Sequence, residues 1–326
     1  MNRSGIGLIV MITAIALSSC SRSKNEVLQA KPAPAGLDGR MFFTAGESGA
    51  TSDLYEGVFA PGLLLYRLTT SQRIGGIGGC KTALTVTNAD RTVGFTDTIQ
   101  HFDAGTLSTP PGLESPKGSG PATGPDCRVL FDHLDQAGQP PTDHLMLLDS
   151  AAMSERDLYS PGPGKVLGIA DWGPGGRVAV FEGTEPSDNH PTVVTGIVIL
   201  LPDGSKRVLP PPVNRLGTLQ WSGSKWMAIG DEANGKTLFL DPDSGARKEL
   251  PGWFPLAWSP DGQRLLVTDA AERKALAVVD SADLTTARMV GHAKKVRFFD
   301  LVWLPSNATA GGPPPMGRRP DDGDGP

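Results

Sequence analysis

The sequence predicts an all-β chain folded as a single β-propeller, a ring of four-stranded antiparallel sheets called blades. A strand–turn–strand unit with a Trp before its turn recurs at a mean spacing of about 44 residues, and propeller blades repeat every ~40–45 residues. Gly (41) and Pro (29) supply about a fifth of the 326 residues. This content disfavours a helical bundle, because both residues break helices.

The clearest copy of the unit contains Pro260-Asp261-Gly262 between two apolar runs. Pro presets φ, Asp accepts hydrogen bonds from nearby backbone and Gly adopts positive φ, so this tripeptide predicts the turn of a β-hairpin. The other copies keep the same order of parts. The first strand of the unit ends at Trp172, Trp221, Trp258 and Trp303. We expect these large aromatic rings to pack between blades.

A weaker copy starts at Leu84 and runs to Asp97, with Val86 in the place of the Trp. At the repeat spacing, the body from 37 to 305 holds about six blades. Five or seven blades stay open as alternatives, because no first strand can be assigned to the third blade.

Strand-like runs supply the remaining blade strands. They are Arg40–Thr44, Gly62–Arg67, Cys127–Asp132, His144–Leu148, Arg156–Tyr159, Val194–Leu200, Lys206–Leu209, Thr237–Leu240, Arg247–Leu250, Leu276–Val279 and Thr286–Val290. The strand at Trp303 has no partners after it, and Arg40–Thr44 has no first strand before it. We therefore predict that the C-terminal strand pairs with the N-terminal blade and closes the ring, which removes exposed sheet edges.

The N-terminus has the layout of an export signal, with Arg3 before the apolar run Ile6–Leu17. A helix of this length rises about 18 Å, too little to cross a hydrocarbon core of about 30 Å. The run ends in Leu17-Ser18-Ser19-Cys20, which resembles the lipobox of bacterial lipoproteins. The resemblance implies cleavage before Cys20 and acylation of Cys20. The alternative is an ordinary secreted protein with an incidental Cys.

These boundaries predict a lipoprotein signal peptide over 1–19, a flexible tether over 20–36, a propeller over 37–305 and a disordered Pro/Gly/Asp-rich tail over 306–326. The membrane lipid that holds acylated Cys20 is then one partner of the chain. We expect the protein on the extracytoplasmic side of the cell membrane, with the outer membrane as an open alternative.

Cys80 and Cys127 remain after Cys20 is assigned to the lipid anchor. An even number of cysteines in an exported chain predicts a disulfide, and two buried thiols are the alternative. The bond would close a loop of about 48 residues, for which the chain-entropy model gives about 4 kcal/mol. The segment from 106 to 126 inside this loop has few apolar residues of its own to bury.

The sequence Trp258-Ser259-Pro260-Asp261-Gly262 resembles the WD40-like repeat of TolB-type bacterial propellers. No Trp-Asp dipeptide closes a repeat, so the hydrogen-bond network of true WD40 repeats is not expected. Propellers of the TolB type are mostly protein-binding platforms of the cell envelope. The resemblance therefore implies an envelope protein as a partner, without naming it.

Few residues offer chemistry. The motifs G-x-S-x-G and H-E-x-x-H do not occur, and we predict no catalytic residue and no cofactor. The glycine cluster Ile74–Gly79 is interpreted as a loop or bulge between blades. Asp132, His133, Asp143 and His144 are weak metal candidates around one hairpin, although adjacent strand residues point to opposite faces.

The complete repeat frame and the lack of a reacting group favour a non-catalytic module that binds a protein or ligand. The alternative is a propeller hydrolase or lactonase with a metal in the central channel, for which Asp97 and Asp269 are further carboxylates to inspect. The net charge of −5 comes without a basic stripe, so nucleic acid is excluded as a partner. We expect a monomeric propeller.

Overall fold

A computed structural model describes residues 24–27, 37, 39–46, 52–60, 62–69, 73–80, 83–90, 96–103, 106–109, 117–124, 126–135, 142–149, 151–184, 192–215, 217–221, 223 and 225–308. The expected signal peptide, Cys20 and most of the expected C-terminal tail lie outside these residues. Within the ranges given above, no helix is both long enough and apolar enough to cross a membrane.

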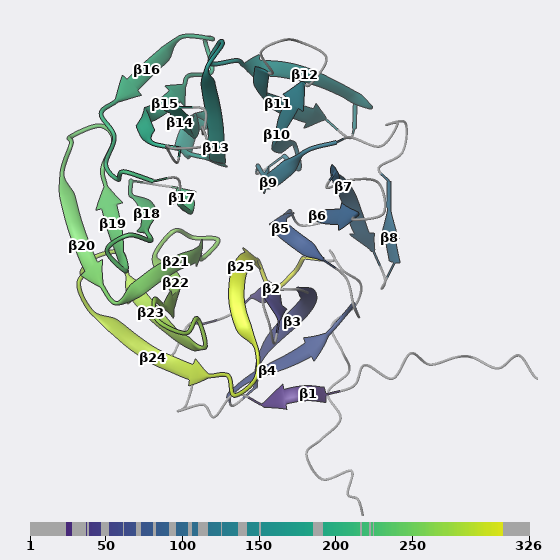
Figure 1. The fold of residues 1–326 in the computed structure, drawn as a ribbon. Coiled ribbons are helices and arrows are strands. Elements are labelled where there is room, and N and C mark those ends of the chain that lie inside the picture. Colours follow the sequence, from purple (N-terminus) through teal and green to yellow (C-terminus); the bar gives the residue numbers. More distant parts are fainter. Residues whose placement is uncertain are drawn as a thin grey trace, which may run out of the picture.

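Six antiparallel sheets stand side by side around a central axis, which confirms the predicted six-bladed propeller (Figure 1). From the innermost strand outward, blades 1 to 3 consist of β25 (Arg297–Leu304), β2 (Arg40–Gly46), β3 (Asp53–Ala60) and β4 (Gly62–Arg67); β5 (Ile74–Gly79), β6 (Leu84–Asp90), β7 (Thr96–Asp103) and β8 (Thr106–Ser108); and β9 (Ser119–Thr123), β10 (Val129–Asp135), β11 (Thr142–Asp149) and β12 (Ser154–Tyr159).

The second half of the ring repeats the same plan. Blades 4 to 6 consist of β13 (Lys165–Trp172), β14 (Val178–Thr184), β15 (Val194–Leu200) and β16 (Lys206–Leu209); β17 (Leu219–Trp221), β18 (Met227–Asp231), β19 (Lys236–Leu240) and β20 (Arg247–Pro251); and β21 (Trp253–Trp258), β22 (Arg264–Asp269), β23 (Ala275–Asp280) and β24 (Ala287–His292). A 3₁₀ turn, Pro174–Gly176, joins β13 to β14.

The turn between β21 and β22 forms as its sequence predicts. Gly262 has a φ of 68° and donates its N–H to the carbonyl of Ser259 at 2.8 Å. The Asp261 carboxylate accepts the backbone N–H of Gln263 at 3.0 Å and the Ser259 hydroxyl at 2.5 Å. The turn thus satisfies its own polar groups and holds the two strands in register.

Two of the repeat tryptophans bridge neighbouring blades. The indole Nε1 of Trp172 donates to the carbonyl of Ala122 in blade 3 at 3.2 Å, and that of Trp258 donates to Gln220 in blade 5 at 3.2 Å. A buried aromatic ring with a satisfied N–H fixes the distance and angle between the blades that it joins. The predicted packing of these rings between blades is therefore observed.

The apolar core also lies between blades and not within any one of them. Phe43 of β2 and Phe298 of β25 place their ring centroids 5.2 Å apart. They belong to a buried cluster that includes Trp303 of blade 1 and Leu266 of blade 6. Each blade therefore depends on its neighbours for its core.

The C-terminal strand closes the ring, as predicted. β25 pairs antiparallel with β2, from Arg40 opposite Leu304 to Gly46 opposite Arg297. The buried Arg40 guanidinium donates to Glu56 at 2.7 and 3.0 Å and to the carbonyl of Ala308 at 3.0 Å. Ala308 is itself buried, so the ordered chain continues just past residue 305.

Blade 2 begins differently from the expectation. The glycine cluster Ile74–Gly79 is neither a loop nor a link between blades but the innermost strand β5, with a register shift between Ile74 and Ile77. Val86 consequently lies on the second strand, β6, and does not occupy the place of the Trp. The third blade starts at β9, inside the segment 106–126, which has few apolar residues of its own to bury, and Cys127 precedes β10.

Part of the expected tether forms a strand. β1 (Lys24–Val27) pairs antiparallel with β4, with Lys24 opposite Tyr66 and Val27 opposite Leu64, and adds a fifth strand to blade 1. The remainder of 20–36 lies outside the described residues.

Candidate functional site: the central channel

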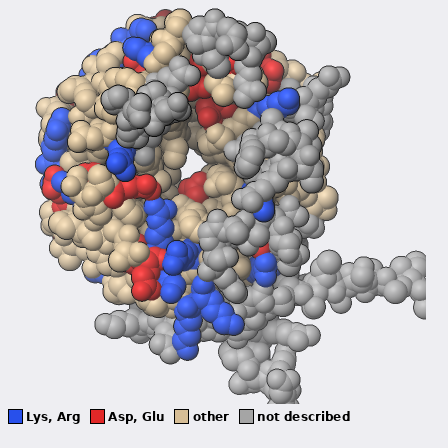
Figure 2. Space-filling view, viewed as in Figure 1, with Lys and Arg blue, Asp and Glu red and all other residues tan. Residues whose placement is uncertain are grey.

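A cavity of about 850 Å³ occupies the centre of the ring. The innermost strands of all six blades line it, and Figure 2 shows its opening on one face, with acidic side chains at its wall. Its lining reaches from Glu232 at one face to Pro260 in the turn at the other. The cavity is therefore the channel along the propeller axis, a common position for propeller ligand sites.

Asp171 lies on the channel wall near the end of β13. One oxygen of its carboxylate accepts the backbone N–H of Trp172 at 2.8 Å, and the other accepts that of Trp221 at 2.6 Å. Trp221 belongs to blade 5, so this side chain joins blades 4 and 5 at the axis.

Asp300 lies on the channel wall in β25 and repeats this arrangement in blade 1. Its carboxylate accepts the N–H of Leu301 at 2.8 Å on its own strand and the N–H of Ile77 at 3.1 Å on β5. It therefore joins blade 1 to blade 2. Blades 1 and 4 are opposite each other in a ring of six, so the two carboxylates stand on opposite walls.

Burial raises the pKa of the Asp171 carboxyl to about 7, against the opposing effect of its two backbone amides, and the charge of Asp300 raises it further. Burial likewise raises the pKa of the Asp300 carboxyl to about 7, against the amides of Ile77 and Leu301. Both carboxyl groups therefore titrate close to neutral pH. A cation between them would favour the ionised form of both.

Two further carboxylates line the channel, and each has a partner. Asp132 accepts the hydroxyl of Ser119 at 2.7 Å, and Glu232 accepts a guanidinium N–H of Arg273 at 2.6 Å. None of the lining residues that the structure describes is Lys or Arg. The channel is therefore acidic.

Blade 2 leaves its part of the wall nearly bare, because four of the six β5 residues are glycines. Behind β5, the buried hydroxyl of Thr87 has no hydrogen-bond partner among the described residues, and the same holds for Thr123 on β9. Both residues belong to the lining. Two buried hydroxyl groups therefore lie directly behind the glycine-rich wall of the channel.

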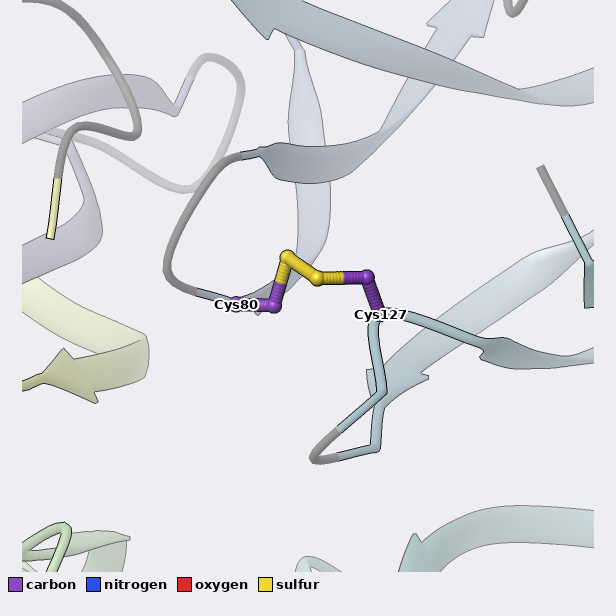
Figure 3. The surroundings of a disulfide bond; sticks show 2 residues. All are labelled: Cys80 and Cys127. Carbon is purple, nitrogen blue, oxygen red and sulfur yellow. A yellow bond between two sulfur atoms is a disulfide. The ribbon is translucent and has the colours of Figure 1, made fainter. Parts of the chain in front are cut away.

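A disulfide lies at the channel's edge and joins blades 2 and 3. Cys80 directly follows β5, and Cys127 lies in the turn before β10; their Cα atoms are 5.3 Å apart (Figure 3). The predicted pairing is therefore observed. It fixes the β5 wall against β9 at the point where β5 has few side chains to pack.

The hairpin residues considered as metal ligands are divided between two faces. His133 and His144 pair directly across β10 and β11, whereas Asp132 and Asp143 are diagonal neighbours on the other face. Asp143 accepts the N–H of Leu167 at 2.8 Å, and His144 contacts Asp157 at 2.5 Å. In the described parts of the chain, no group of three or more His, Cys, Asp or Glu side chains is placed to hold a metal ion.

Asp269, the other carboxylate to inspect, caps its own loop. It accepts four backbone N–H groups, from Glu272, Arg273, Lys274 and Ala275, at 2.6 to 3.2 Å, and these lower the pKa that burial would raise. It ends β22, whereas Asp97 lies near the start of β7, so the two positions are not equivalent. The side chain of Asp97 is outside the described residues.

Sequence reasoning missed Asp171 and Asp300, the two carboxylates that matter most for the channel. Each is a lone acidic residue inside an otherwise apolar innermost strand, and such a residue must find polar partners when it is buried. The sequence shows this pattern, because it predicts both strands, the one that ends at Trp172 and the one that ends at Trp303.

The fold and the channel together define a β-propeller protein with an acidic axial channel. Among solved structures, the chain is similar to TolB from Acinetobacter baumannii, with a TM-score of 0.63 and 17% identity over 84% of this chain and 68% of that one. It is also similar to a chain of a nidogen/laminin complex, with a TM-score of 0.55 and 17% identity over 82% and 98% of the two chains. An oligogalacturonate lyase in complex with manganese matches with a TM-score of 0.48 and 14% identity over 77% and 73%.

No protein-family model matches the sequence, and no curated protein matches it significantly. At identities this low, the structural similarity establishes a TolB-like propeller fold and leaves function to the site itself.

Proposed function

We propose that this protein is a non-catalytic binding module whose central channel receives a positively charged group of a protein or ligand partner. The observation that carries the proposal is the channel, which is about 850 Å³ in volume. Carboxylates line it, and no Lys or Arg that the structure describes belongs to its lining. An acidic cavity with desolvated walls concentrates cations, because the low dielectric of the protein focuses the field.

The positions of the chemically capable side chains support binding over catalysis. Asp171 and Asp300 use both carboxylate oxygens to join blades, and Asp269 caps a loop. His144 and Asp143 are engaged on opposite faces of one hairpin. These assignments give each group a structural task, whereas a hydrolase or lactonase would need several of them to meet at one point.

We further propose that Cys20 carries the lipid that holds the propeller at the extracytoplasmic side of the membrane. The Leu17–Cys20 motif directly after the apolar run supports this anchor. A Cys20→Ala variant should then incorporate no labelled fatty acid and should leave the membrane fraction. Equal labelling and equal membrane retention of the variant would contradict the anchor.

A charge placed in the channel tests the binding role. Ile169 lines the channel and is 38% exposed, so Ile169→Arg adds a cation there with little loss of packing. Val208, 59% exposed on the outer strand β16, provides the matched control Val208→Arg. Crosslinked neighbours in intact envelopes should be lost with Ile169→Arg and retained with Val208→Arg. Unchanged neighbours in Ile169→Arg, or metal-dependent hydrolysis by the purified protein, would reject the proposal.

A further inference from the structure

Two histidines lie side by side on one face of blade 3, outside the lining of the channel. The register of β10 and β11 places His133 directly opposite His144 (Figure 1 labels both strands). Residues directly opposite each other on antiparallel strands point to the same face, and their Cβ atoms are about 4.5–5.5 Å apart. The two imidazole rings therefore start from neighbouring points of one surface.

The histidine pair lies at the end of the core between blades 2 and 3. Phe131 lies two residues before the first histidine and Met146 two residues after the second, so they share the face of the pair. Phe131 packs with Ile99 of blade 2 in a buried cluster, and Met146 packs against that cluster. Both histidines are half-buried, and the side chain of His144 is 25% exposed. The pair thus stands on a packed base and is accessible from solvent.

Each ring makes a hydrogen bond through its Nδ1 atom. The Nδ1 of His133 lies 2.8 Å from the carbonyl oxygen of Lys117. The Nδ1 of His144 lies 2.5 Å from a carboxylate oxygen of Asp157. A backbone carbonyl and an ionised carboxylate only accept, so each neutral ring carries its proton on Nδ1. The lone pair of each ring is then on Nε2, the nitrogen through which a histidine held in this way binds metal.

The two hydrogen bonds turn the Nε2 atoms toward each other. The strands of blade 3 lie in the order β12, β11, β10, β9. Asp157 belongs to β12 and Lys117 precedes β9, so both acceptors lie outside the β10–β11 pair, one on each side. Nδ1 and Nε2 are on opposite edges of an imidazole ring. With each Nδ1 edge facing outward, both Nε2 edges face the space between the two rings.

The strand geometry fits an ion in that space. A metal ion lies about 2.0–2.1 Å from each imidazole nitrogen, so tetrahedral coordination needs two Nε2 atoms roughly 3.3 Å apart. Rings whose Cβ atoms are about 4.5–5.5 Å apart reach this separation when each leans inward by roughly 1 Å. The backbone bridge between Lys117 and Thr98 of blade 2 fixes one of the two acceptors that hold the rings in this orientation.

We propose that His133 and His144 bind one divalent transition-metal ion through their Nε2 atoms. Imidazole suits Zn²⁺, Cu²⁺ and Ni²⁺, and Cu²⁺ binds most tightly of these ions. A backbone carbonyl and a carboxylate are the usual outer partners of metal-binding histidines, and the structure supplies one of each. Two protein ligands leave coordination positions for water, so the ion is exchangeable. This site lies apart from the channel and goes beyond the binding role proposed above.

Metal titration of the purified full chain, after alkylation of free thiols, tests the site. We expect about one Zn²⁺ per chain in calorimetry, and an electron paramagnetic resonance spectrum of bound Cu²⁺ with two coordinated imidazole nitrogens. His133→Ala and His144→Ala should each abolish the two-nitrogen spectrum. The double variant should bind no more weakly than either single one, because one ion needs both rings. His292→Ala is the matched control, since that exposed histidine lies opposite Ala275, and it should bind like wild type.

Asp157→Ala tests the positioning role of the carboxylate while both ligands remain. The Asp157 side chain is 44% exposed, so the variant should keep the wild-type circular dichroism and Tm. We expect Zn²⁺ binding to weaken about tenfold or more. In the metal-free protein, ¹⁵N NMR should show the Nδ1-protonated tautomer for both rings, and His144 should lose this preference in the variant.

Several results would overturn the inference. Wild-type binding by His133→Ala or His144→Ala, a Cu²⁺ spectrum with one imidazole nitrogen, or Nε2-protonated rings in the metal-free protein would each exclude the shared ion. Binding that is lost in Asp300→Asn but kept in both histidine variants would place the ion in the channel instead. That outcome would leave the cation-binding role of the channel intact, so the two proposals fail separately.

Discussion

The carboxylates of Asp171 and Asp300 line the central channel and also join neighbouring blades. Each is buried at the channel wall, which costs free energy for the charged form, and each accepts one backbone N–H from the next blade. If the side chains were apolar, the N–H groups of Trp221 and Ile77 would lack these acceptors. The ring therefore keeps two acidic groups at its axis, and their raised pKa values follow from that placement.

Asp300→Asn should make stability less dependent on pH. The Asp300 carboxyl has a pKa of about 7 in the folded state against 3.8 in the unfolded chain, so the folded protein binds more protons between these values. Wild-type stability therefore falls as pH rises from about 4 to 7, by up to about 4 kcal/mol from this group. We expect the Tm of the variant relative to wild type to rise between pH 4 and pH 8.

Asp103→Asn supplies the control for this titration, because Asp103 is exposed on β7. Its Tm should follow that of wild type across the same pH range. A Tm difference between Asp300→Asn and wild type that stays constant from pH 4 to pH 8 would show that burial of the carboxyl does not govern stability.

The acidic channel could have been predicted only in part from single residues. The number of cysteines predicts the disulfide. Strand geometry argues against metal binding by both members of an Asp-His dipeptide, because adjacent strand residues point to opposite faces. The bond from Asp300 to Ile77 joins residues far apart in the sequence, and no local pattern contains it. Ring closure brings them together, so the site depends on the fold and not on a motif.

β5 makes an innermost strand almost without side chains. Its glycines allow β9 to approach closely, since a Cβ atom on Gly78 would lie 2.5 Å from the Thr123 hydroxyl and 3.1 Å from the carbonyl oxygen of Pro121. The Cys80–Cys127 disulfide then fastens the same junction covalently. Close backbone contact and a covalent link replace the aromatic packing that other junctions use.

Gly78→Ala should destabilise the junction of blades 2 and 3. Its methyl group would force Thr123 and the β9 backbone to move, at a cost of about 1–3 kcal/mol in the free energy of unfolding. Gly75→Ala is the matched control on the same strand, because its nearest neighbour, the Cβ of Thr87, is 3.8 Å away. That variant should stay within about 0.5 kcal/mol of wild type. Urea denaturation measures both, and equal midpoints would contradict the close approach.

The units that contain a Trp made most of the fold predictable. In blades 4 to 6, turn chemistry and alternating apolar residues lie within a short stretch around Trp172, Trp221 and Trp258, so local patterns determine the strands. β5 and β9 lack this information, because Gly and small residues in a strand resemble those of a loop. Their strand conformation is imposed by neighbours on both sides.

The ring closes without a covalent link between its ends. β25 contributes the innermost strand of a blade whose other strands come from the beginning of the chain, and its register with β2 spans the whole strand. Arg40 adds a bond from β2 to the backbone of Ala308, beyond the end of β25. The first blade is therefore complete only when both ends of the body are present.

Two C-terminal truncations distinguish the contribution of the closing strand β25 to stability from that of the residues that follow it. A chain that ends at Val296 lacks β25. Strand β2 of blade 1 and the innermost strand of blade 6 then lose their packing against Phe298 and Trp303. We expect its thermal unfolding to lose cooperativity and to shift to lower temperature, because an open ring exposes a sheet edge and part of the core. A chain that ends at Ala308 keeps every described residue and the acceptor of Arg40. It should unfold at the wild-type temperature in calorimetry; wild-type unfolding of the shorter chain would mean that β25 does not hold the ring closed.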